Sequence, residues 1–219
     1  MTITKKTRLV PAPFVGTVVH IRVGEPLAFK FRAGVLTAGS EHVTVSWGDG
    51  VVEEFATGLA DVGHVYPSPG DYVIKISDDV TSVCIGAMDE TSDYCTIYAP
   101  MVTCVSSNAS RLVSFPSYSF QNCFNMTTFD VVGSSLVSLF SGVFKDCRAL
   151  EGEFRFPNIS RLVGITPQFA GCTKISVLHF AREHENAITS SSGYKADPTL
   201  GTGVEGVCRF DLPDGVPRS

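Results

Sequence analysis

One motif recurs three times in the second half of the chain and constrains the fold more than any other feature. The motif Phe-x-x-Cys occurs at Phe120–Cys123, Phe144–Cys147 and Phe169–Cys172, at steps of 24 and 25 residues. An apolar segment precedes each motif, and one apolar residue follows each Cys by three: Leu112–Phe115, Leu136–Leu139 and Leu162–Ile165, then Met126, Leu150 and Ile175. Such a period, with one short strand and one turn per unit, predicts a solenoid.

The first 79 residues follow another pattern, which is typical of short β-strands. Four segments alternate between apolar and polar residues and are rich in β-branched and aromatic side chains. They are Val18–Val23, Leu27–Phe31, Val43–Trp47 and Tyr72–Ile76. Turn-forming residues lie between them, at Ala38–Ser40, Gly48–Gly50 and Ser68–Asp71. This arrangement predicts an antiparallel β-sandwich.

Three pieces of this segment resemble the signature of PKD-type immunoglobulin-like domains. They are the turn Trp47-Gly48-Asp49-Gly50, the run His64-Val65-Tyr66 and the closing strand Pro69–Ile76. The signature positions in this chain are Trp47, Asp49, Gly50, His64, Tyr66, Gly70 and Tyr72. The resemblance implies a small, non-catalytic β-sandwich that presents or spaces another part of the protein.

Asp49 and Gly50 suit a tight turn, because glycine adopts positive φ without steric cost. Trp47 supplies a large core anchor just before this turn. The alternative is that Asp49 binds calcium together with Glu53 and Glu54. The turn is the favoured interpretation, because no D-x-D-x-D-G spacing gathers oxygen ligands around an ion.

The repeat unit resembles the BspA-like leucine-rich repeats of bacterial surface proteins and some protozoan ones. The resemblance rests on Phe-x-x-Cys-x-x-Leu followed by a short Phe/Pro strand, as in Phe154–Pro157, and covers residues 80–180. Val80–Val83 and Val102–Val105 resemble degenerate leading units. We expect them to continue the ladder directly from the last strand of the sandwich. Because no Pro/Gly/Ser linker separates Ile76 from Val80, we expect the two parts to share a continuous sheet edge or a packed junction and to move as one body.

A cap is expected after the last repeat, because a terminal unit otherwise exposes its apolar face and sheet edge. Phe180, His184, Ala187 and Ile188 are spaced as one face of a short helix, which Gly193 would end. The segment 207–212 then alternates like a strand that closes the solenoid.

The seven cysteines are interpreted as structural. They are Cys84, Cys95, Cys104, Cys123, Cys147, Cys172 and Cys208, an odd number without a C-x-x-C pair. One Cys per repeat predicts a column of buried thiols that pack as small hydrophobic groups. A disulfide among the first three remains open if the protein is exported. We expect no metal site and no cofactor.

Motifs for catalysis are missing from the sequence. It contains no G-x-S-x-G and no P-loop, and His179 and His184 lack the spacing of a zinc-binding helix. The net charge is −5, and no run of basic residues forms a patch. Both observations argue against nucleic-acid binding. No segment reaches the ~18 apolar residues of a membrane span. An export signal is expected to be absent or already removed.

Together these features predict a mainly β chain. An immunoglobulin-like sandwich, residues 1–79, would join a short leucine-rich-repeat solenoid with a helix and strand cap, residues 80–219. The predicted function is non-enzymatic: a bacterial surface or secreted module that mediates adhesion to a host protein, a cell or a glycan. The alternative is a structural spacer or tip component of a larger assembly, such as a phage tail or a surface stalk.

Overall fold

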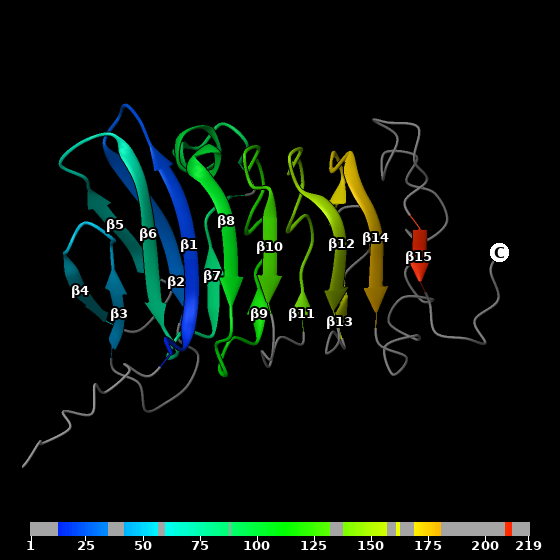
Figure 1. Cartoon of the computed structure of the whole chain (residues 1–219), viewed down its shortest axis with the longest axis horizontal. Coiled ribbons are helices and arrows are strands. Elements are labelled where there is room, and N and C mark those ends of the chain that lie inside the picture. Colours follow the sequence, from blue (N-terminus) through cyan, green and yellow to red (C-terminus); the bar gives the residue numbers. More distant parts are fainter. Residues whose placement is uncertain are drawn as a thin grey trace, which may run out of the picture.

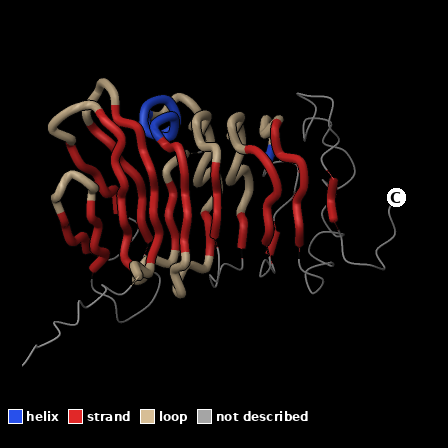
Figure 2. Tube along the Cα trace, in the orientation of Figure 1, coloured by secondary structure: helices blue, strands red, loops and turns tan. Residues whose placement is uncertain are grey.

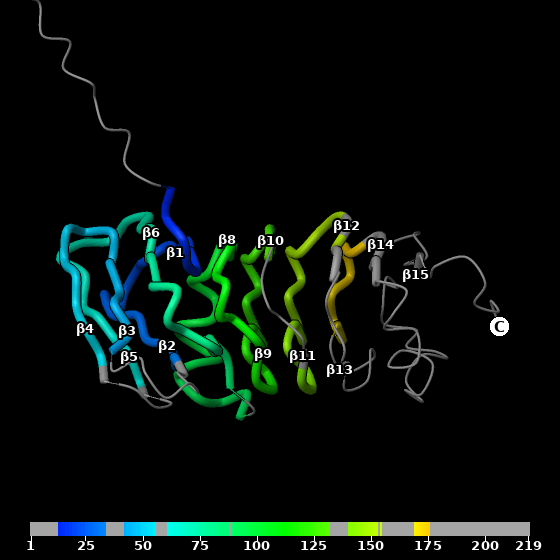
Figure 3. The backbone as a smooth tube through the Cα atoms, turned by 90° about the horizontal axis from the view of Figure 1, so that it is seen from below, coloured from blue at the N-terminus to red at the C-terminus, as the bar shows by residue number. Residues whose placement is uncertain are grey.

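The structure is a computed structural model that describes residues 13–34, 42–56, 60–87, 89–131, 138–156, 161–162, 169–180 and 209–211. Most of its regular elements are β-strands, which confirms the prediction of a mainly β chain. The strands stand side by side along the long axis of the molecule (Figure 1). Seen from below, they form two layers (Figure 3).

The strands form three sheets. Sheet I has the order β10-β8-β1-β6-β3-β4, sheet II the order β13-β11-β9-β7-β2-β5, and sheet III the order β12-β14-β15. The strands of sheet I are β1 (Gly16–Val23), β3 (His42–Ser46), β4 (Val52–Ala56), β6 (Gly70–Ser77), β8 (Val102–Ser107) and β10 (Thr128–Val131). Those of sheet II are β2 (Ala28–Gly34), β5 (Ala60–Val65), β7 (Ser82–Cys84), β9 (Ser114–Phe115), β11 (Ser138–Leu139) and β13 (Arg161–Leu162). Sheet III contains β12 (Glu151–Phe156), β14 (Lys174–Phe180) and β15 (Arg209–Asp211).

The four strands expected in the N-terminal part are present as β1, β2, β3 and β6. The sequence pattern does not predict β4 and β5. β4 contains Glu53 and Glu54, and β5 contains Asp61 and Gly63, all of which are residue types depleted in strands. Both strands lie at the outer edge of their sheets, where half of the backbone faces outward and such residues are common.

Sheets I and II both run from the N-terminal strands into the repeats without a break (Figure 3). β8 pairs antiparallel with β1, and β7 pairs antiparallel with β2. The expectation that the repeats extend from the last strand of the sandwich is therefore wrong. That strand, β6, has β1 on one side and β3 on the other, so it has no free edge to extend.

Polar groups fix the join between β1 and β8. The Asn108 Oδ1 accepts a hydrogen bond from the Gly16 amide at 2.9 Å, and the Asn108 Nδ2 donates to the Phe14 carbonyl at 3.0 Å. The hydroxyls of Thr17 and Ser107, both buried, lie 2.9 Å apart. Because buried polar groups are costly without partners, these bonds favour one register of β8 against β1.

In the repeats the chain alternates between the two layers. β9, β11 and β13 pair in parallel in sheet II, while β10, β12 and β14 lie in the opposite layer (Figure 1). Ser138 pairs with Ser114, which is the 24-residue step of the motif. On its other side Ser138 pairs with Arg161, a step of 23 residues, and Leu139 pairs with Leu162.

The Phe-x-x-Cys motifs stack on one another. The rings of Phe120 and Phe144 lie with centroids 5.7 Å apart, and those of Phe144 and Phe169 lie 5.2 Å apart, both in stacked geometry. The Cys147 thiol donates to the Phe120 carbonyl at 3.1 Å, and the Cys172 thiol donates to the Phe144 carbonyl at 2.9 Å. Each thiol therefore ties its own turn to the turn before it.

The residue before each Cys of the motif has a left-handed backbone. Its φ is +64° at Asn122, +60° at Asp146 and +78° at Gly171. Asn, Asp and Gly are the residues that tolerate this conformation best. A Cβ atom at Gly171 would also lie 2.5 Å from the Asp146 Oδ1. The tight turn that brings successive motifs together thus depends on the residue type at this position.

A helical segment that the sequence pattern does not predict connects β7 to β8 (Figure 2). It consists of a π-helical turn, η1 (Tyr94–Tyr98), and a 3₁₀ turn, η2 (Ala99–Met101). Cys95, Tyr98, Ala99 and Met101 are buried against the core. The segment covers the space between the two layers at the junction of the N-terminal strands and the repeats.

The cap is described in part. Phe180 is the last residue of β14, so the expected helix does not include it. The backbone from Lys174 to Phe180 pairs in parallel with β12, which favours an extended conformation up to this point. His184, Ala187, Ile188 and Gly193 lie outside the described residues. β15 falls within the strand expected at 207–212 and pairs with β14.

A single apolar core runs through the described part of the molecule. It extends from Val19 and Trp47 in the N-terminal strands to Phe144 and Phe169 in the repeats. The division at residues 79 and 80 stays a prediction. Among the described residues no helix has the length and hydrophobicity needed to cross a membrane.

Candidate functional site

The signature residues of the N-terminal part form one aromatic cluster. The Trp47 ring stacks on the His64 ring at a centroid distance of 5.0 Å, and His64 contacts Tyr66 edge to face at 4.8 Å. Tyr66 then contacts Tyr72 at 4.1 Å. The Tyr66 hydroxyl donates to the Trp47 carbonyl at 3.2 Å, and the Trp47 Nε1 donates to the Glu53 Oε2 at 2.6 Å. This cluster supports the fold at the end of the two layers.

The turn after Trp47 has the geometry expected of its glycines. Gly50 has φ of +99° and Gly48 has φ of +88°. A Cβ atom at Gly48 would lie 2.7 Å from the Val73 carbonyl oxygen, so the turn packs against β6. Gly70 is the first residue of β6.

The Asp49 carboxylate lies inside this turn, with only 7% of its side chain exposed. Its Oδ1 accepts a hydrogen bond from the Val51 amide at 3.0 Å, and its Oδ2 lies 2.7 Å from the His64 Nε2. Burial raises the pKa of Asp49, but these two hydrogen bonds and the charge of His64 outweigh burial, and the net pKa is lowered. Both carboxylate oxygens therefore serve the turn. No group of three or more His, Cys, Asp or Glu among the described residues is placed to hold a metal ion.

The nine repeat positions named in the sequence analysis lie in the core and form no surface. Their residues are 0–3% exposed: Phe120, Cys123, Met126, Phe144, Cys147, Leu150, Phe169, Cys172 and Ile175. Burial raises the pKa of the Cys147 and Cys172 thiols well above the ordinary value. A raised pKa favours the protonated thiol, which is the form that donates the hydrogen bonds of Cys147 and Cys172 to the preceding turns.

The six cysteines in the described part of the chain are all free thiols. Among the three for which a disulfide was left open, Cys84 and Cys95 are buried and Cys104 is half-buried. The Cys84 thiol donates to the Gly86 carbonyl at 3.3 Å, and the Cys95 thiol donates to the Ala87 carbonyl at 3.1 Å. Cys208 lies outside the described residues.

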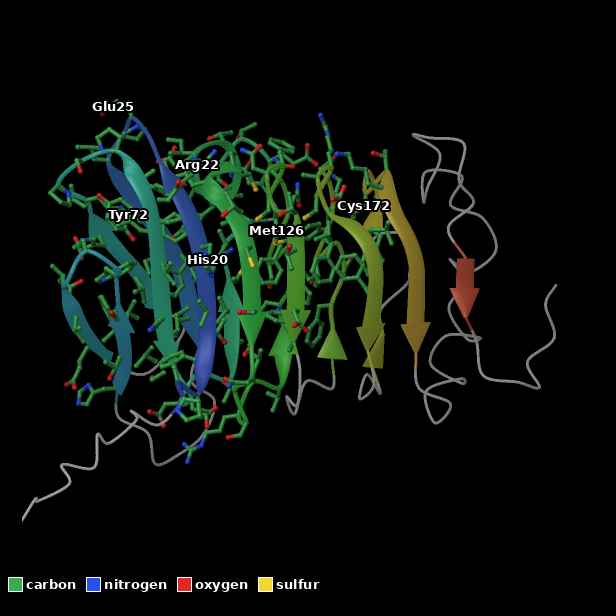
Figure 4. The ribbon with its side chains drawn as sticks, in the orientation of Figure 1. His20, Arg22, Glu25, Tyr72, Met126 and Cys172 are labelled. Carbon is green, nitrogen blue, oxygen red and sulfur yellow. The ribbon has the colours of Figure 1, made fainter. Side chains whose placement is uncertain are left out.

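The outer face of sheet I is an extended surface of mixed polar and apolar side chains. Strand pairing places one row of side chains across all six strands, in the order Asp130, Ser106, Val18, Lys75, Ser46 and Val52. A second row crosses four strands, in the order Thr128, Cys104, His20 and Val73. Figure 4 shows His20 and Arg22 along β1. The surface thus joins the N-terminal strands to the first repeats.

The charges on this outer face are mixed and mostly exposed. The Arg22 Nε donates to the Asp71 Oδ1 at 2.8 Å across β1 and β6. The hydrogen bond and charge of Arg22 lower the pKa of Asp71. Burial, with a smaller effect of Asp130, raises the pKa of the Cys104 thiol. The face therefore offers hydroxyls, one thiol, charges of both signs and the exposed side chains of Val52 and Val73, which suits recognition by hydrogen bonds, ion pairs and apolar contacts.

An open cleft of about 710 Å³ borders this face at the end of β1. Its walls come from the turn after β1, from η1 and η2, from β8 and from the turn before β10. The apolar lining includes Pro26, Ile97 and Met101, and the polar lining includes Glu25 and Asn125. Glu25 lies at the turn beyond β1 (Figure 4). The volume falls in the range of ligand-binding sites.

Sequence reasoning did not identify this face or the cleft. A signal for the face exists in β1, where Val18, His20 and Arg22 alternate with buried residues. The neighbouring strands cannot be deduced from that signal, because β8 joins β1 from a distant part of the sequence. The cleft carries no local signal, since its walls come from three separate segments of the sequence, within residues 22–26, 96–103 and 125–127.

Comparisons with known proteins found no similarity that would name a family. No family model matches the chain, no curated protein matches it, and no solved structure matches its fold.

Proposed function

We propose that the chain is a non-catalytic binding module whose ligand contacts the outer face of sheet I. The observation that carries the proposal is the row from Asp130 to Val52, which crosses both parts of the molecule on paired strands. Strand pairing holds these side chains at fixed spacings, and their replacement leaves the core beneath them unchanged. A rigid polar face of this kind favours binding of a protein or a glycan.

In this proposal residues 1–79 are a PKD-like sandwich and residues 80–219 are BspA-like leucine-rich repeats. The cluster around Trp47 and the 24-residue pairing of Ser114 with Ser138 support it. The protein would be a bacterial surface or secreted protein, located outside the cell, that adheres to a host protein, another cell or a glycan. This assignment rests on the sequence resemblance.

A binding screen tests the proposal. The purified chain is tested against extracellular-matrix proteins and a glycan array, and every saturable hit is repeated with Lys75→Glu and Asp130→Lys. Arg111→Glu is the matched control, because Arg111 is an exposed cation outside the row. We expect the two variants on the face to weaken binding about ten-fold and the control to bind as the wild type does.

Cys104 provides a second readout at the same face. Its half-buried thiol lies in the second row of side chains, next to His20 and Thr128. A bound ligand should slow its alkylation, measured by mass spectrometry, while the buried Cys147 stays unmodified with or without ligand.

Light scattering on the same sample separates the alternative function. The proposal would be contradicted if no saturable binding were found in the screen and the chain formed a discrete oligomer in solution. That result would favour a structural spacer or tip component of a larger assembly, such as a phage tail or a surface stalk.

A further inference from the structure

In the described part of the chain, β5 has one unpaired edge, on the sheet opposite the proposed binding face. β5 is the last strand of sheet II, and its only partner is β2 in the described part of the chain. The Tyr66 amide donates to the Leu27 carbonyl at 2.7 Å, just beyond the paired strands. In an antiparallel ladder the bonded positions alternate, so Val62 and His64 also bond toward β2.

It follows that Asp61, Gly63 and Val65 direct their amides and carbonyls away from β2, along the free edge. The side chains of Asp61 and Val65 lie on the outer face of sheet II, opposite Arg32 and Ala28, and Gly63 lies between them opposite Lys30. Val65 is 70% exposed. An edge on which three alternate residues direct their backbone groups outward is a template for an additional strand.

Lys30 determines which additional strand fits. A Cβ atom at Gly63 would lie 2.8 Å from the Lys30 Cγ, 3.4 Å from its Cδ and 3.5 Å from its Cε. The stem of Lys30 therefore lies across Gly63, and its ammonium is carried toward the edge of the sheet. Lys30 is exposed and forms no hydrogen bond or ion pair with the described residues.

The other charged groups along this edge already have partners. The Asp61 Oδ1 accepts a hydrogen bond from the Tyr94 hydroxyl at 2.7 Å, and Arg32 lies 5.0 Å from the centroid of the Tyr94 ring. The Glu53 Oε2 accepts the Trp47 Nε1, and its distance to the His64 Nδ1 is 3.9 Å. Lys30 is therefore the cation at this edge that no described side chain engages, while Asp61 and Glu53 keep their charges but are held by Tyr94 and Trp47.

A groove of about 540 Å³ follows β5 and offers room for side chains of an added strand. Its apolar lining is Ala28, Phe55 and Val65. The rest of the lining is Lys30, Gly63, His64 and the two carboxylates of Glu53 and Asp61. The other edge at this end of the molecule, β4, carries Glu53 and Glu54. Charged residues on an edge strand discourage further pairing. β4 carries two carboxylates and β5 carries one, Asp61, so β5 is the less protected of the two edges.

We infer that the β5 edge binds an extended peptide segment of another protein by strand addition, with an acidic side chain of that segment opposite Gly63. Backbone hydrogen bonds to Asp61, Gly63 and Val65 supply the attachment, and the ion pair with Lys30 supplies the selectivity. This site is separate from the outer face of sheet I, so either proposal can fail alone.

Two synthetic peptides test the inference by titration of the isotope-labelled full chain in NMR experiments. Both have capped ends and the sequence Thr-Val-Thr-X-Thr-Val-Thr, with Glu at the centre of one and Lys at the centre of the other. We expect shifts at the amides of Asp61, Gly63 and Val65, and about five-fold tighter binding of the Glu peptide. In Lys30→Glu, whose exposed site carries no core packing, the preference should reverse.

Gly63→Ala serves as the second variant. Its Cβ displaces the Lys30 stem, so the preference for the Glu peptide should shrink while both peptides still shift the β5 amides. Equal affinity of the two peptides for the wild type, shifts confined to other strands, or no shifts at millimolar peptide would each overturn the inference. Shifts of the β5 amides that depend on protein concentration without peptide would also overturn it, because the edge would then bind a second copy.

Discussion

Single polar residues hold the tight turns of this molecule. Asp49 satisfies the Val51 amide and the His64 ring at once, and in doing so fixes the turn that follows Trp47. Asn108 does the same where the first repeat strand joins β1. In both cases one short side chain replaces the backbone partners that a turn lacks.

Asp49 makes the stability of the chain sensitive to acid. Burial raises its pKa, but the hydrogen bonds from Val51 and His64 and the charge of His64 lower the pKa by more, so the net pKa is depressed. The ionised Asp49 carboxylate therefore stabilises the fold fully at pH values above its unfolded pKa of about 4. This stabilisation is lost as the pH falls through the lower pKa of the folded state. We expect the free energy of unfolding in urea to fall between pH 6 and pH 3 by more in the wild type than in Asp49→Asn. Equal losses would contradict this role.

Gly171 tests the left-handed position before each Cys. Gly171→Ala places a Cβ 2.5 Å from the Asp146 Oδ1 at φ of +78°, whereas Gly50→Ala has positive φ with open space around the Cβ. We expect Gly50→Ala to cost about 1–2 kcal/mol for its backbone conformation, and Gly171→Ala about 1 kcal/mol more for the contact. Urea unfolding of both variants measures the difference. A smaller loss of unfolding free energy in Gly171→Ala than in Gly50→Ala would contradict the close contact and show that the turn relaxes around the added Cβ.

Some of these turn conformations could be predicted from the sequence, and some of the side-chain bonds could not. Asn122, Asp146 and Gly171 occupy one repeat position and are all residue types that accept positive φ, so the pattern signals the turn. The bond from Trp47 to Glu53 has no such signal, because its geometry depends on how β3 and β4 pair.

Among the elements, the Phe-x-x-Cys turns bear the packing of the repeats. Phe144 stacks between Phe120 and Phe169 and also contacts Phe129 from β10 at a centroid distance of 4.7 Å. Aromatic contacts on several sides favour an ordered stack beyond the area that they bury.

Phe144→Ala should therefore be far more costly than truncation of a ring at the surface. Phe144 is fully buried, and we expect its removal to cost about 3–5 kcal/mol. Phe124→Ala is the matched control, because the half-buried Phe124 mainly supports Arg148, 5.0 Å from its ring centroid. We expect about 1 kcal/mol for the control in the same thermal or urea unfolding assay. Similar costs for the two variants would contradict a continuous stack.

Element prediction succeeded where the pattern was strong and the strand central. β1, β2, β3 and β6 alternate clearly, whereas β4 with Glu53 and Glu54 and β5 with Gly63 do not. β9 and β11 have only two residues each, so their position depends on parallel neighbours. The alternation in β1 indicates an exposed face of sheet I, but the extent of that face depends on which strands pair with β1 and could not be predicted from the sequence.

For the whole molecule, the shared sheets and core link the two parts. β1 and β2 each accept a strand of the repeats, and the apolar core passes from one part to the other. The proposed binding face needs this continuity, because its rows of side chains cross the junction. A joint that moved would break the rows at β8.

Equilibrium unfolding with one probe in each part tests this continuity most directly. Trp47, the only tryptophan, is buried in the N-terminal strands, and Cys147 is buried in the repeats. Trp47 fluorescence and pulsed alkylation of Cys147, measured by mass spectrometry along one urea titration, should give the same midpoint, because cooperative units unfold together. Two separated midpoints, with Cys147 protected after Trp47 is exposed or the reverse, would contradict a single continuous body.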